Sequence, residues 1–446
     1  MRQERRFYKT VLNIALPVTL QSLLSSSFSV VDQIMTGQLG STSIAGIGLG
    51  GKFSSIFSVL LSAIATVAGI MIAQYMGKRS DREVSRSFWL NLCMAFGLAV
   101  IFMAMCVGMP MQIMRLYTED EATRKIAAEY LNILAISYIP MAAGSLVSTL
   151  LRCMEAAMLP LYSSVFGAVV NTGLNYVLIF GKLGFPRMGV KGAALASVIS
   201  QVVSCLLTLS LFLWHYQRQE IRMEVVLGLS RNGRKQYIGI LLPILACEFL
   251  WSFGENVYTA IYGHMGTSAC AAMTLTIPIQ VLMIGALSGV SQAAGVIIGK
   301  AMGSKEYDRA YCESKKLMLY GLGGAVILSI GLMAIGKYYV GIYQVEQAVR
   351  ITACQILVAF ALISPVKVQN MILGGGIIRS GGKTNYVMWI DMIGTWIFGV
   401  PLGLLAAFVW KLSIPYVYFV LSLEECVRFG ISVWVFRRRK WMNSLE

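Results

Sequence analysis

Long apolar segments separated by short polar connectors fill this chain from end to end. A helix rises about 1.5 Å per residue, so roughly 20 apolar residues cross a bilayer. Twelve segments reach that length, and the pattern predicts an all-α polytopic membrane protein with twelve transmembrane helices. They lie near residues 12–38, 46–76, 88–113, 126–150, 160–180, 190–214, 237–262, 268–300, 313–335, 348–374, 385–409 and 412–436.

The second half of the chain repeats the first at a constant offset of 226 residues. Pro17 then aligns with Pro243, and 17 of the 64 positions over 14–77 are identical. Prolines constrain the backbone of a helix, so we expect these two to have a gating or structural role. The repeat predicts two homologous six-helix lobes, 1–214 and 237–446, joined by a cytoplasmic linker at 215–236.

Lysine and arginine are distributed unevenly over the connectors. With the N-terminus placed in the cytoplasm, the inside connectors carry 26 of these residues and the outside connectors carry 10. Cytoplasmic loops of membrane proteins are enriched in basic residues, so we expect both termini to be cytoplasmic in a multi-pass protein of the cell (inner or plasma) membrane. The same asymmetry accounts for the net charge of +16 without nucleic acid as a partner.

Composition supports a membrane location. Only 13% of the residues are charged, whereas 57% are hydrophobic, and soluble domains average about 25% charged residues. The nine cysteines stand singly and form no C-x-x-C pair. We therefore expect neither a disulfide framework nor a metal site, and no cofactor.

A polar stripe runs along the first apolar segment. Its members follow spacings of four, four, three and four and so share one helix face; they are Gln21, Ser25, Ser29, Asp32 and Thr36. An ionisable residue at membrane depth is a mark of an ion or substrate path. We expect Asp32 to bind the coupling ion and its polar neighbours to line the substrate cavity. A local structural partner that neutralises Asp32 is the alternative.

The seventh segment, the counterpart of the first, carries two acids. Glu248 and Glu255 stand two helical turns apart on one face, with Ser252 between them and Thr259 beyond. Acids are costly towards lipid, so this face is expected to point inward. We predict ion coupling for the two acids and cavity positions for Ser252 and Thr259. A partner base for Glu255 remains an alternative.

Other polar residues inside apolar segments allow more than one role. Asn171 and Asn175 lie one turn apart in the fifth segment, where their amides could coordinate a cation, bond a neighbouring Asp, or simply join two helices. Asp391 and Lys367 are a possible pair with a structural or gating role. The spacing of Glu424 and Arg428 predicts an i, i+4 ion pair in the twelfth segment.

Several of these positions resemble the multidrug and toxic compound extrusion (MATE) family, bacterial type. The resemblance covers about residues 10–440 and rests on motifs in four segments. They are Pro17 with Asp32, Gly37-Gln-Leu-Gly40 and Ala45; Asn171-x-x-x-Asn175 with Leu178-Ile-Phe-Gly181; Pro243 with Glu248, Trp251 and Tyr262-Gly-x-x-Gly266; and Arg379-x-Gly-Gly382.

The resemblance implies a secondary active antiporter with two six-helix lobes around a central cavity. Members export organic, often cationic and lipophilic compounds in exchange for H⁺ or Na⁺ by alternating access. The conserved acid of the first span maps onto Asp32, and an Asn and an Asp of the fifth span map onto Asn171 and Asn175. The second of these is Asn here, which removes one carboxylate. Other members place coupling acids in the second lobe, where Glu248 and Glu255 stand.

Two rival functions are considered. A lipid-linked precursor flippase of the same superfamily would line its cavity with several cations, whereas Lys367 is the only basic residue that the sequence places mid-membrane. A membrane-embedded enzyme would need a metal constellation or a Ser/Lys dyad, and none is found, so we predict a protein that is not an enzyme. We expect small-molecule substrates, membrane lipids as partners, and a monomer.

Overall fold

The protein is almost entirely helical in the computed structural model, which describes residues 2–217, 224–226, 228, 231–343 and 345–445. Within these residues no β-strand is present. The first half contains α1 (Arg2–Gly37), α2 (Ser41–Gly77), α3 (Asp81–Gly108), α4 (Pro110–Arg115), α5 (Glu121–Leu134), the short 3₁₀ helix η1 (Ala135–Ser137), α6 (Tyr138–Cys153), α7 (Met158–Phe180) and α8 (Val190–Tyr216).

The second half begins with long helices and continues in shorter pieces. Its elements are α9 (Arg231–His264), α10 (Thr267–Gly303), α11 (Tyr307–Gly341), α12 (Gln347–Asn370), η2 (Met371–Ile378), α13 (Asn385–Asp391), η3 (Met392–Gly399), α14 (Val400–Leu404), η4 (Leu405–Val409), α15 (Ile414–Ser422) and α16 (Glu424–Arg437). Residues 218–223, 227 and 229–230 of the predicted linker lie outside the described residues.

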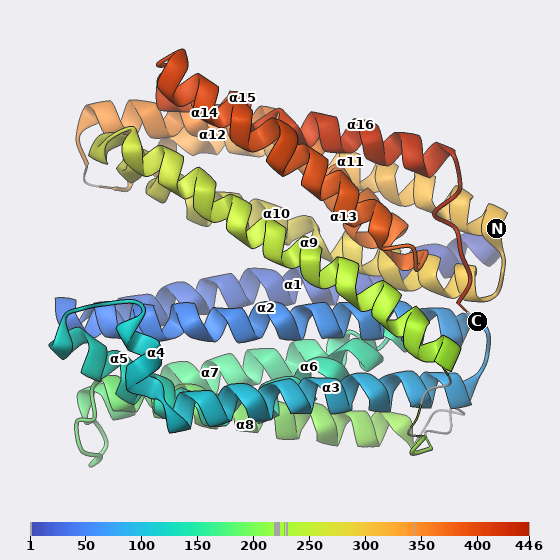
Figure 1. Cartoon of the computed structure of the whole chain (residues 1–446), viewed down its shortest axis with the longest axis horizontal. Coiled ribbons are helices and arrows are strands. Elements are labelled where there is room, and N and C mark those ends of the chain that lie inside the picture. The colour runs from blue at the N-terminus through green and yellow to red at the C-terminus, as the bar shows by residue number, and fades with distance from the viewer. Residues whose placement is uncertain (1, 218–223, 227, 229–230, 344, 446) are drawn as a thin grey trace. The chain divides into compact units, whose positions relative to one another are not determined.

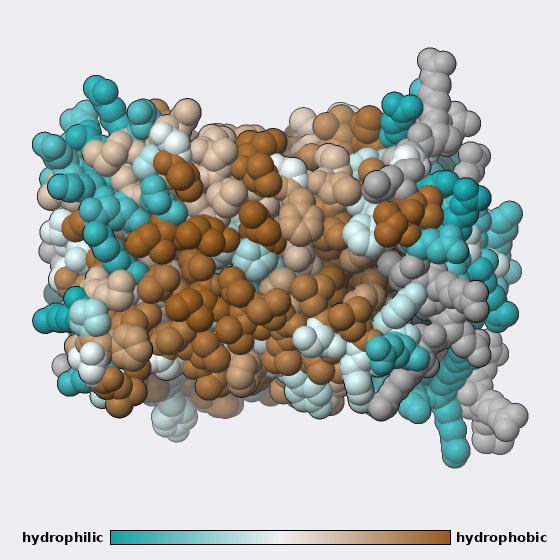
Figure 2. Space-filling model, turned by 90° about the horizontal axis from the view of Figure 1, so that it is seen from below, coloured by the Kyte–Doolittle hydropathy of each residue, from teal (hydrophilic) through white to brown (hydrophobic). Residues whose placement is uncertain are grey.

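Eleven helical stretches in the described part of the chain are long and apolar enough to cross a membrane. The predicted twelfth, 412–436, corresponds to α15 and α16, which are 9 and 14 residues long and are separated at Leu423. Each piece alone is too short to span a bilayer, but together they reach the required length. On the face drawn in Figure 2, apolar side chains cover most of the middle, while hydrophilic side chains gather towards the two ends. The predicted all-α membrane fold is confirmed.

The chain divides into two compact units. One, here called the N-half unit, comprises Leu20–Ile72 and Ser80–Gly228. In it α8 packs against α5, α6 and α7, and α3 packs against α6. Aromatic rings form part of the core, with Phe57 and Tyr138 only 4.4 Å apart between ring centroids. The aromatic contacts fix α6 against α2 in this unit.

The second unit, here called the C-half unit, comprises Met1–Thr19, Ala73–Arg79 and Leu229–Glu446. In it α10, α11 and α12 pack against one another, and α12 also contacts α15 and α16. Helices α1 and α2 each contribute residues to both units. The boundary in α1 falls just after Pro17, which lies inside that helix. The lobe boundaries predicted from the repeat stay a prediction.

The segment after α16 folds back onto the C-half unit. Trp441 is fully buried, and a Cβ atom added to Gly381 would collide with its backbone oxygen. The Leu445 amide donates to Oε1 of Gln74 over 2.8 Å, and the Gln74 amide donates to the Ser380 carbonyl over 2.7 Å. These bonds tie the end of α2 to the connector before α13.

Three π-helical stretches interrupt the later spans of the C-half unit. They are η2, η3 and η4. A π-helix is rare and often accompanies a functional site, because the wider turn displaces the side chains that follow it. Polar residues stand at the borders of two of them. Asn370 and Arg379 flank η2, and Asp391 immediately precedes η3.

Candidate functional site

In the N-half unit, Asp32 is the centre of a small polar cluster. The Asn175 side chain, which is fully buried, donates from Nδ2 to Asp32 Oδ1 over 2.6 Å. The same amide donates to Asn171 Oδ1 over 3.2 Å, and Asn171 donates to the Ser200 hydroxyl over 3.4 Å. The structure thus brings together the acid of α1 and both asparagines of α7, and the cluster continues to α8.

The charge of Asp32 has no cationic partner in this cluster. Its side-chain hydrogen bond comes from a neutral amide. The other end of that amide, Asn175 Oδ1, is buried and accepts no hydrogen bond within the described structure. A buried, unsatisfied amide oxygen costs free energy. A carboxylate that is hydrogen-bonded to an amide with a free oxygen offers oxygen atoms of the kind that bind a proton or a hard cation.

The other stripe residues of α1 divide into two groups. Thr36 is buried and its hydroxyl donates to the Asp32 carbonyl over 2.9 Å. Gln21 Oε1 accepts a hydrogen bond from Arg152. Ser25 and Ser29 are exposed. Two residues of the predicted stripe, Gln21 and Thr36, are therefore hydrogen-bonded within the protein, whereas Ser25 and Ser29 are accessible to solvent or lipid.

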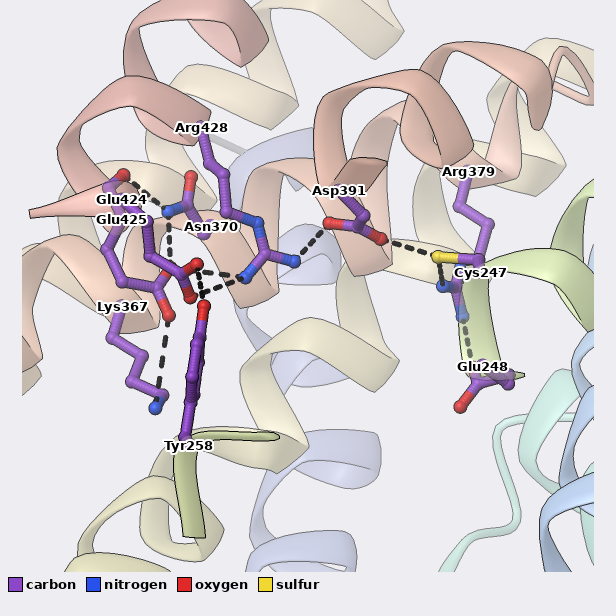
Figure 3. Close-up of polar contacts among 10 residues, drawn as sticks. All are labelled: Cys247, Glu248, Tyr258, Lys367, Asn370, Arg379, Asp391, Glu424, Glu425 and Arg428. Atoms are coloured by element: carbon purple, nitrogen blue, oxygen red, sulfur yellow. Dashed lines mark hydrogen bonds and ion pairs between the residues drawn. The ribbon is translucent and has the colours of Figure 1, made fainter. Parts of the chain in front are cut away.

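The C-half unit contains a much larger polar network, shown in Figure 3. Arg428 on α16 is its centre. Its guanidinium pairs with Asp391, lies 3.6 Å from Glu425 Oε2, and lies 4.0 Å from Glu424 Oε1. The predicted Glu424–Arg428 ion pair is confirmed. Both glutamates are buried, so the guanidinium neutralises acids that have little access to solvent.

The network extends in two directions from Arg428. On one side, the Tyr258 hydroxyl donates to Glu424, while the Asn370 amide donates to Glu425 Oε2 over 2.8 Å. Lys367 Nζ lies 3.9 Å from Glu425 Oε1 and completes this side. These contacts connect α9, α12 and α16 through charged or charge-assisted bonds.

On the other side, a thiol joins two ion pairs. Cys247 donates to Asp391 and accepts from Arg379, whose Nη2 lies 3.6 Å from the sulfur. Arg379 also lies 3.3 Å from Glu248 Oε1. The network therefore continues from Lys367 to Glu248, as the dashed lines in Figure 3 show.

Two glycines of η3 allow the backbone to lie close to the charged side chains of the network. A Cβ atom on Gly394 would collide with the Arg428 side chain, and one on Gly399 would collide with both the Glu424 carboxylate and the Tyr258 hydroxyl. The π-helical backbone thus approaches the charged groups closely, as only glycine permits.

The possible pairing of Asp391 with Lys367 is wrong. Asp391 binds Arg428 and Lys367 faces Glu425. Lys367 is not the only base in the interior of the C-half unit, because Arg428 lies within α16 and its side chain is only 13% exposed.

The residues of the predicted α9 stripe are not gathered in one place. Glu248 is partly buried and pairs with Arg379, whereas Glu255 is exposed. Ser252 is partly buried, and the Thr259 hydroxyl donates to the Glu255 backbone carbonyl. Pro243 is buried inside α9.

Several members of the network were missed by the sequence interpretation. They are Cys247, Tyr258, Asn370, Arg379 as an interior base, and Glu425. Two adjacent acids followed by Arg428 inside an apolar segment are a signal that could have found Glu425. Tyr258 occupies the position that the repeat aligns with Asp32, a further signal. Among the described residues, no group of three or more His, Cys, Asp or Glu side chains could hold a metal ion.

The repeated helical halves and the polar clusters among apolar helices define a polytopic membrane transporter. A family model described as MatE matches residues 17–177 and 243–405, once in each half. The chain belongs to the MATE family of multidrug efflux transporters.

Curated relatives cover nearly the whole chain. "Uncharacterized transporter YisQ" of Bacillus subtilis (strain 168) is 20% identical over 438 residues, which are 98% of this chain and 95% of the relative. "Probable multidrug resistance protein NorM" of Bacillus cereus is 25% identical over 402 residues, covering 87% and 86%.

Solved structures share the fold. A MATE crystal structure in complex with MaL6 has a TM-score of 0.88 at 16% identity, covering 96% of this chain and 95% of that one. A MOP superfamily transporter from Pyrococcus furiosus has a TM-score of 0.86 at 17% identity with the same coverage. At these identities the likeness establishes the fold alone.

Proposed function

We propose that this protein is a secondary active antiporter that exports organic, cationic and lipophilic compounds in exchange for H⁺ or Na⁺. The observation that carries the proposal is the Asp32 cluster. A carboxylate among apolar helices receives a hydrogen bond from a neutral amide, and that amide keeps a buried oxygen without a partner. Such a site is incomplete until a cation or a proton arrives.

Exchange follows from competition for this negative charge. With Asp32 ionised, the site attracts an organic cation; with Asp32 protonated or bound to Na⁺, that attraction is lost. Binding of the ion on the outside therefore releases the drug, and release of the ion inside restores drug binding. The two bound states must also favour different conformations, because coupling requires unequal affinities for the two.

Polar groups of α1 and α9, all exposed or half-buried except the buried Thr36, are our candidates for the substrate cavity. They are Gln21, Ser25, Ser29, Thr36, Ser252 and Thr259. Pro17 and Pro243 each interrupt the hydrogen-bond ladder of a long helix, which allows the two parts of the helix to bend. We propose that these prolines are the bending points during alternating access.

The C-half network is the second candidate for the coupling site. It contains four carboxylates, Glu248, Asp391, Glu424 and Glu425, but only three cationic side chains, Lys367, Arg379 and Arg428. One further positive charge would balance it. Its acids already have cationic or hydroxyl partners, unlike Asp32, so we rank it behind the Asp32 cluster. Glu255 is exposed and is ranked last.

The remaining proposals concern the cellular setting. We propose a monomer in the cell membrane with both termini in the cytoplasm. The excess of Lys and Arg in the connectors assigned to the inside supports this orientation.

The test is ethidium flux in proteoliposomes of the purified full chain, under an imposed proton gradient or an imposed sodium gradient. We expect one gradient to drive flux and Asp32→Asn to abolish it. Glu4→Gln is the matched control, because Glu4 is an exposed acid on the same helix with a surface ion pair to Lys316. Undiminished gradient-driven flux in Asp32→Asn would refute the assignment.

A further inference from the structure

Arg152, at the end of α6 in the N-half unit, is a cation without an acid. Nη2 donates to Gln21 Oε1 over 3.4 Å, which is long for a hydrogen bond of a charged donor. Its Nε is buried and has no hydrogen-bond partner in the described structure. No described carboxylate forms an ion pair with it. One donor of this half-buried guanidinium, Nε, is therefore left without a partner in the described structure.

Arg379 gives a comparison, because it follows the fourth span of the second half as Arg152 follows the fourth span of the first; the repeat offset of 226 places the two arginines one residue apart. The offset of 226 residues aligns Gln21 with Cys247. Arg152 contacts Gln21 and Arg379 contacts Cys247, so each arginine reaches the corresponding residue of the first helix in its own half. The two arginines therefore make comparable contacts, although they are one residue out of register in the repeat.

The two halves differ at the residue that follows Gln21 in the first and Cys247 in the second. Glu248 neutralises Arg379, but the position that the repeat aligns with Glu248 is Ser22. The first half has kept the arginine and has no acid there. A guanidinium in a membrane protein normally pairs with an acid or a carbonyl group, because an isolated charge is costly there.

We infer that Arg152 and Gln21 form an anion-binding point for an oxyanion group, a carboxylate or a phosphate. The planar guanidinium presents paired donors that match such groups. The anion would take the place that Glu248 occupies beside Arg379. Gln21 also lies on the polar stripe of α1, four residues before Ser25. A carboxylate on a transported compound would thus be held on the same helix that carries Asp32.

This inference deepens the proposed function. It rests on that function where the anionic group belongs to a transported compound. It assigns a contact for the anionic group of any compound that carries both a cationic and an anionic group. An anionic phospholipid headgroup has the same chemistry and is the other source. The experiment separates the two.

Two dyes that differ by one carboxylate provide the first arm. Rhodamine B carries a free carboxylate, and its ethyl ester is a cation of nearly the same size and shape. We would measure their equilibrium binding to the full chain in nanodiscs of phosphatidylcholine by fluorescence polarisation. We expect wild type to bind rhodamine B about tenfold more tightly than its ester, the scale of one charge-assisted contact.

The variants are chosen to remove the anion site in two independent ways. Arg152→Gln deletes the charge, and Ser22→Glu rebuilds the acid that the second half has beside Arg379. Both should bring the two dyes to equal affinity while the ester still binds. Ser22→Gln has the same size as Ser22→Glu without the charge and should keep the preference. Retained preference in both Arg152→Gln and Ser22→Glu would overturn the inference.

The second arm tests the lipid source. Nanodiscs containing phosphatidylglycerol are compared with phosphatidylcholine nanodiscs by native mass spectrometry. Phosphatidylglycerol retained by wild type and lost from Ser22→Glu would support the anion site with lipid as its occupant. Equal binding of both dyes by wild type, together with no such lipid difference, would refute the anion site. That result would leave the proposed antiport intact, whereas failure of the ester itself to bind would count against the proposed function.

Discussion

The two units differ in how the charge of an interior acid is compensated. In the N-half unit, Asp32 receives a hydrogen bond from the neutral Asn175, and no carboxylate of the described residues forms an ion pair with Arg152. In the C-half unit, Glu248 pairs with Arg379, and Glu424, Glu425 and Asp391 share Arg428. The duplicated halves therefore differ in where charge is compensated.

The difference suggests a division of roles. A network in which every acid has a cationic or hydroxyl partner resists change, because breaking one pair leaves an uncompensated charge. A single acid with a neutral partner can gain or lose a cation at little structural cost. We therefore propose that exchange takes place in the N-half unit and that the C-half network provides rigidity.

The largest effect is expected for Arg428→Gln. It removes the shared partner of Asp391, Glu424 and Glu425 and leaves these acids uncompensated. We expect a loss of roughly 3–5 kcal/mol of unfolding free energy, the range for removing one partner of a buried ion pair. Thermal unfolding in detergent micelles measures it. An unchanged unfolding midpoint would contradict a structural role for the network.

Arg152 and Arg379, which each follow the fourth span of their half, give a comparison. Arg379→Gln leaves Glu248 unpaired and should cost about 1–3 kcal/mol. Arg152→Gln leaves no acid behind and should change stability by less than about 1 kcal/mol. The two unfolding midpoints are measured side by side. Equal losses would show that Arg152 is neutralised within the protein after all.

The thiol between the two ion pairs can be tested by size-matched replacements. Cys247→Ala removes the link between Asp391 and Arg379, and we expect a loss of about 1 kcal/mol. Cys247→Ser keeps a donor and an acceptor and should lose less. If alanine and serine behave alike in thermal unfolding, the sulfur contributes packing only.

The smallest effect on stability is expected for Asp32→Asn. The Asn175 amide can still donate to the new side chain, so the change should stay within about 1 kcal/mol. Ethidium transport should nevertheless be lost. A variant that unfolds readily would instead assign Asp32 to the structural framework.

Much of the architecture could be predicted from the sequence. Hydrophobic length predicts the spans, and the constant repeat offset predicts two related halves. The contact of Asp32 with Asn175 and the Glu424–Arg428 pair also follow, because polar residues inside apolar segments seek one another. Spacing along one helix predicts the Glu424–Arg428 pair, and it predicts the helix face on which Asp32 lies.

The rest depends on tertiary geometry. Asp391 and Lys367 were paired because they are opposite charges in neighbouring spans, but the π-helical stretches η2 and η3 change the direction of the side chains beside them. Arg379 stands between two predicted segments and Arg428 stands close to the basic end of the chain, so hydropathy does not show that their side chains face the interior. The missing acid at Arg152 became visible only when the contacts of Arg379 could be compared with it.

The central claim is that one coupling cation exchanges at Asp32 and not in the C-half network. The most direct measurement is cation release when saturating ethidium is added to purified protein, as protons in weakly buffered solution or as radioactive sodium. We predict about one cation released per ethidium bound by wild type and by Glu424→Gln, and none by Asp32→Asn. Release that survives in Asp32→Asn and disappears in Glu424→Gln would contradict the claim and move the coupling site to the C-half unit.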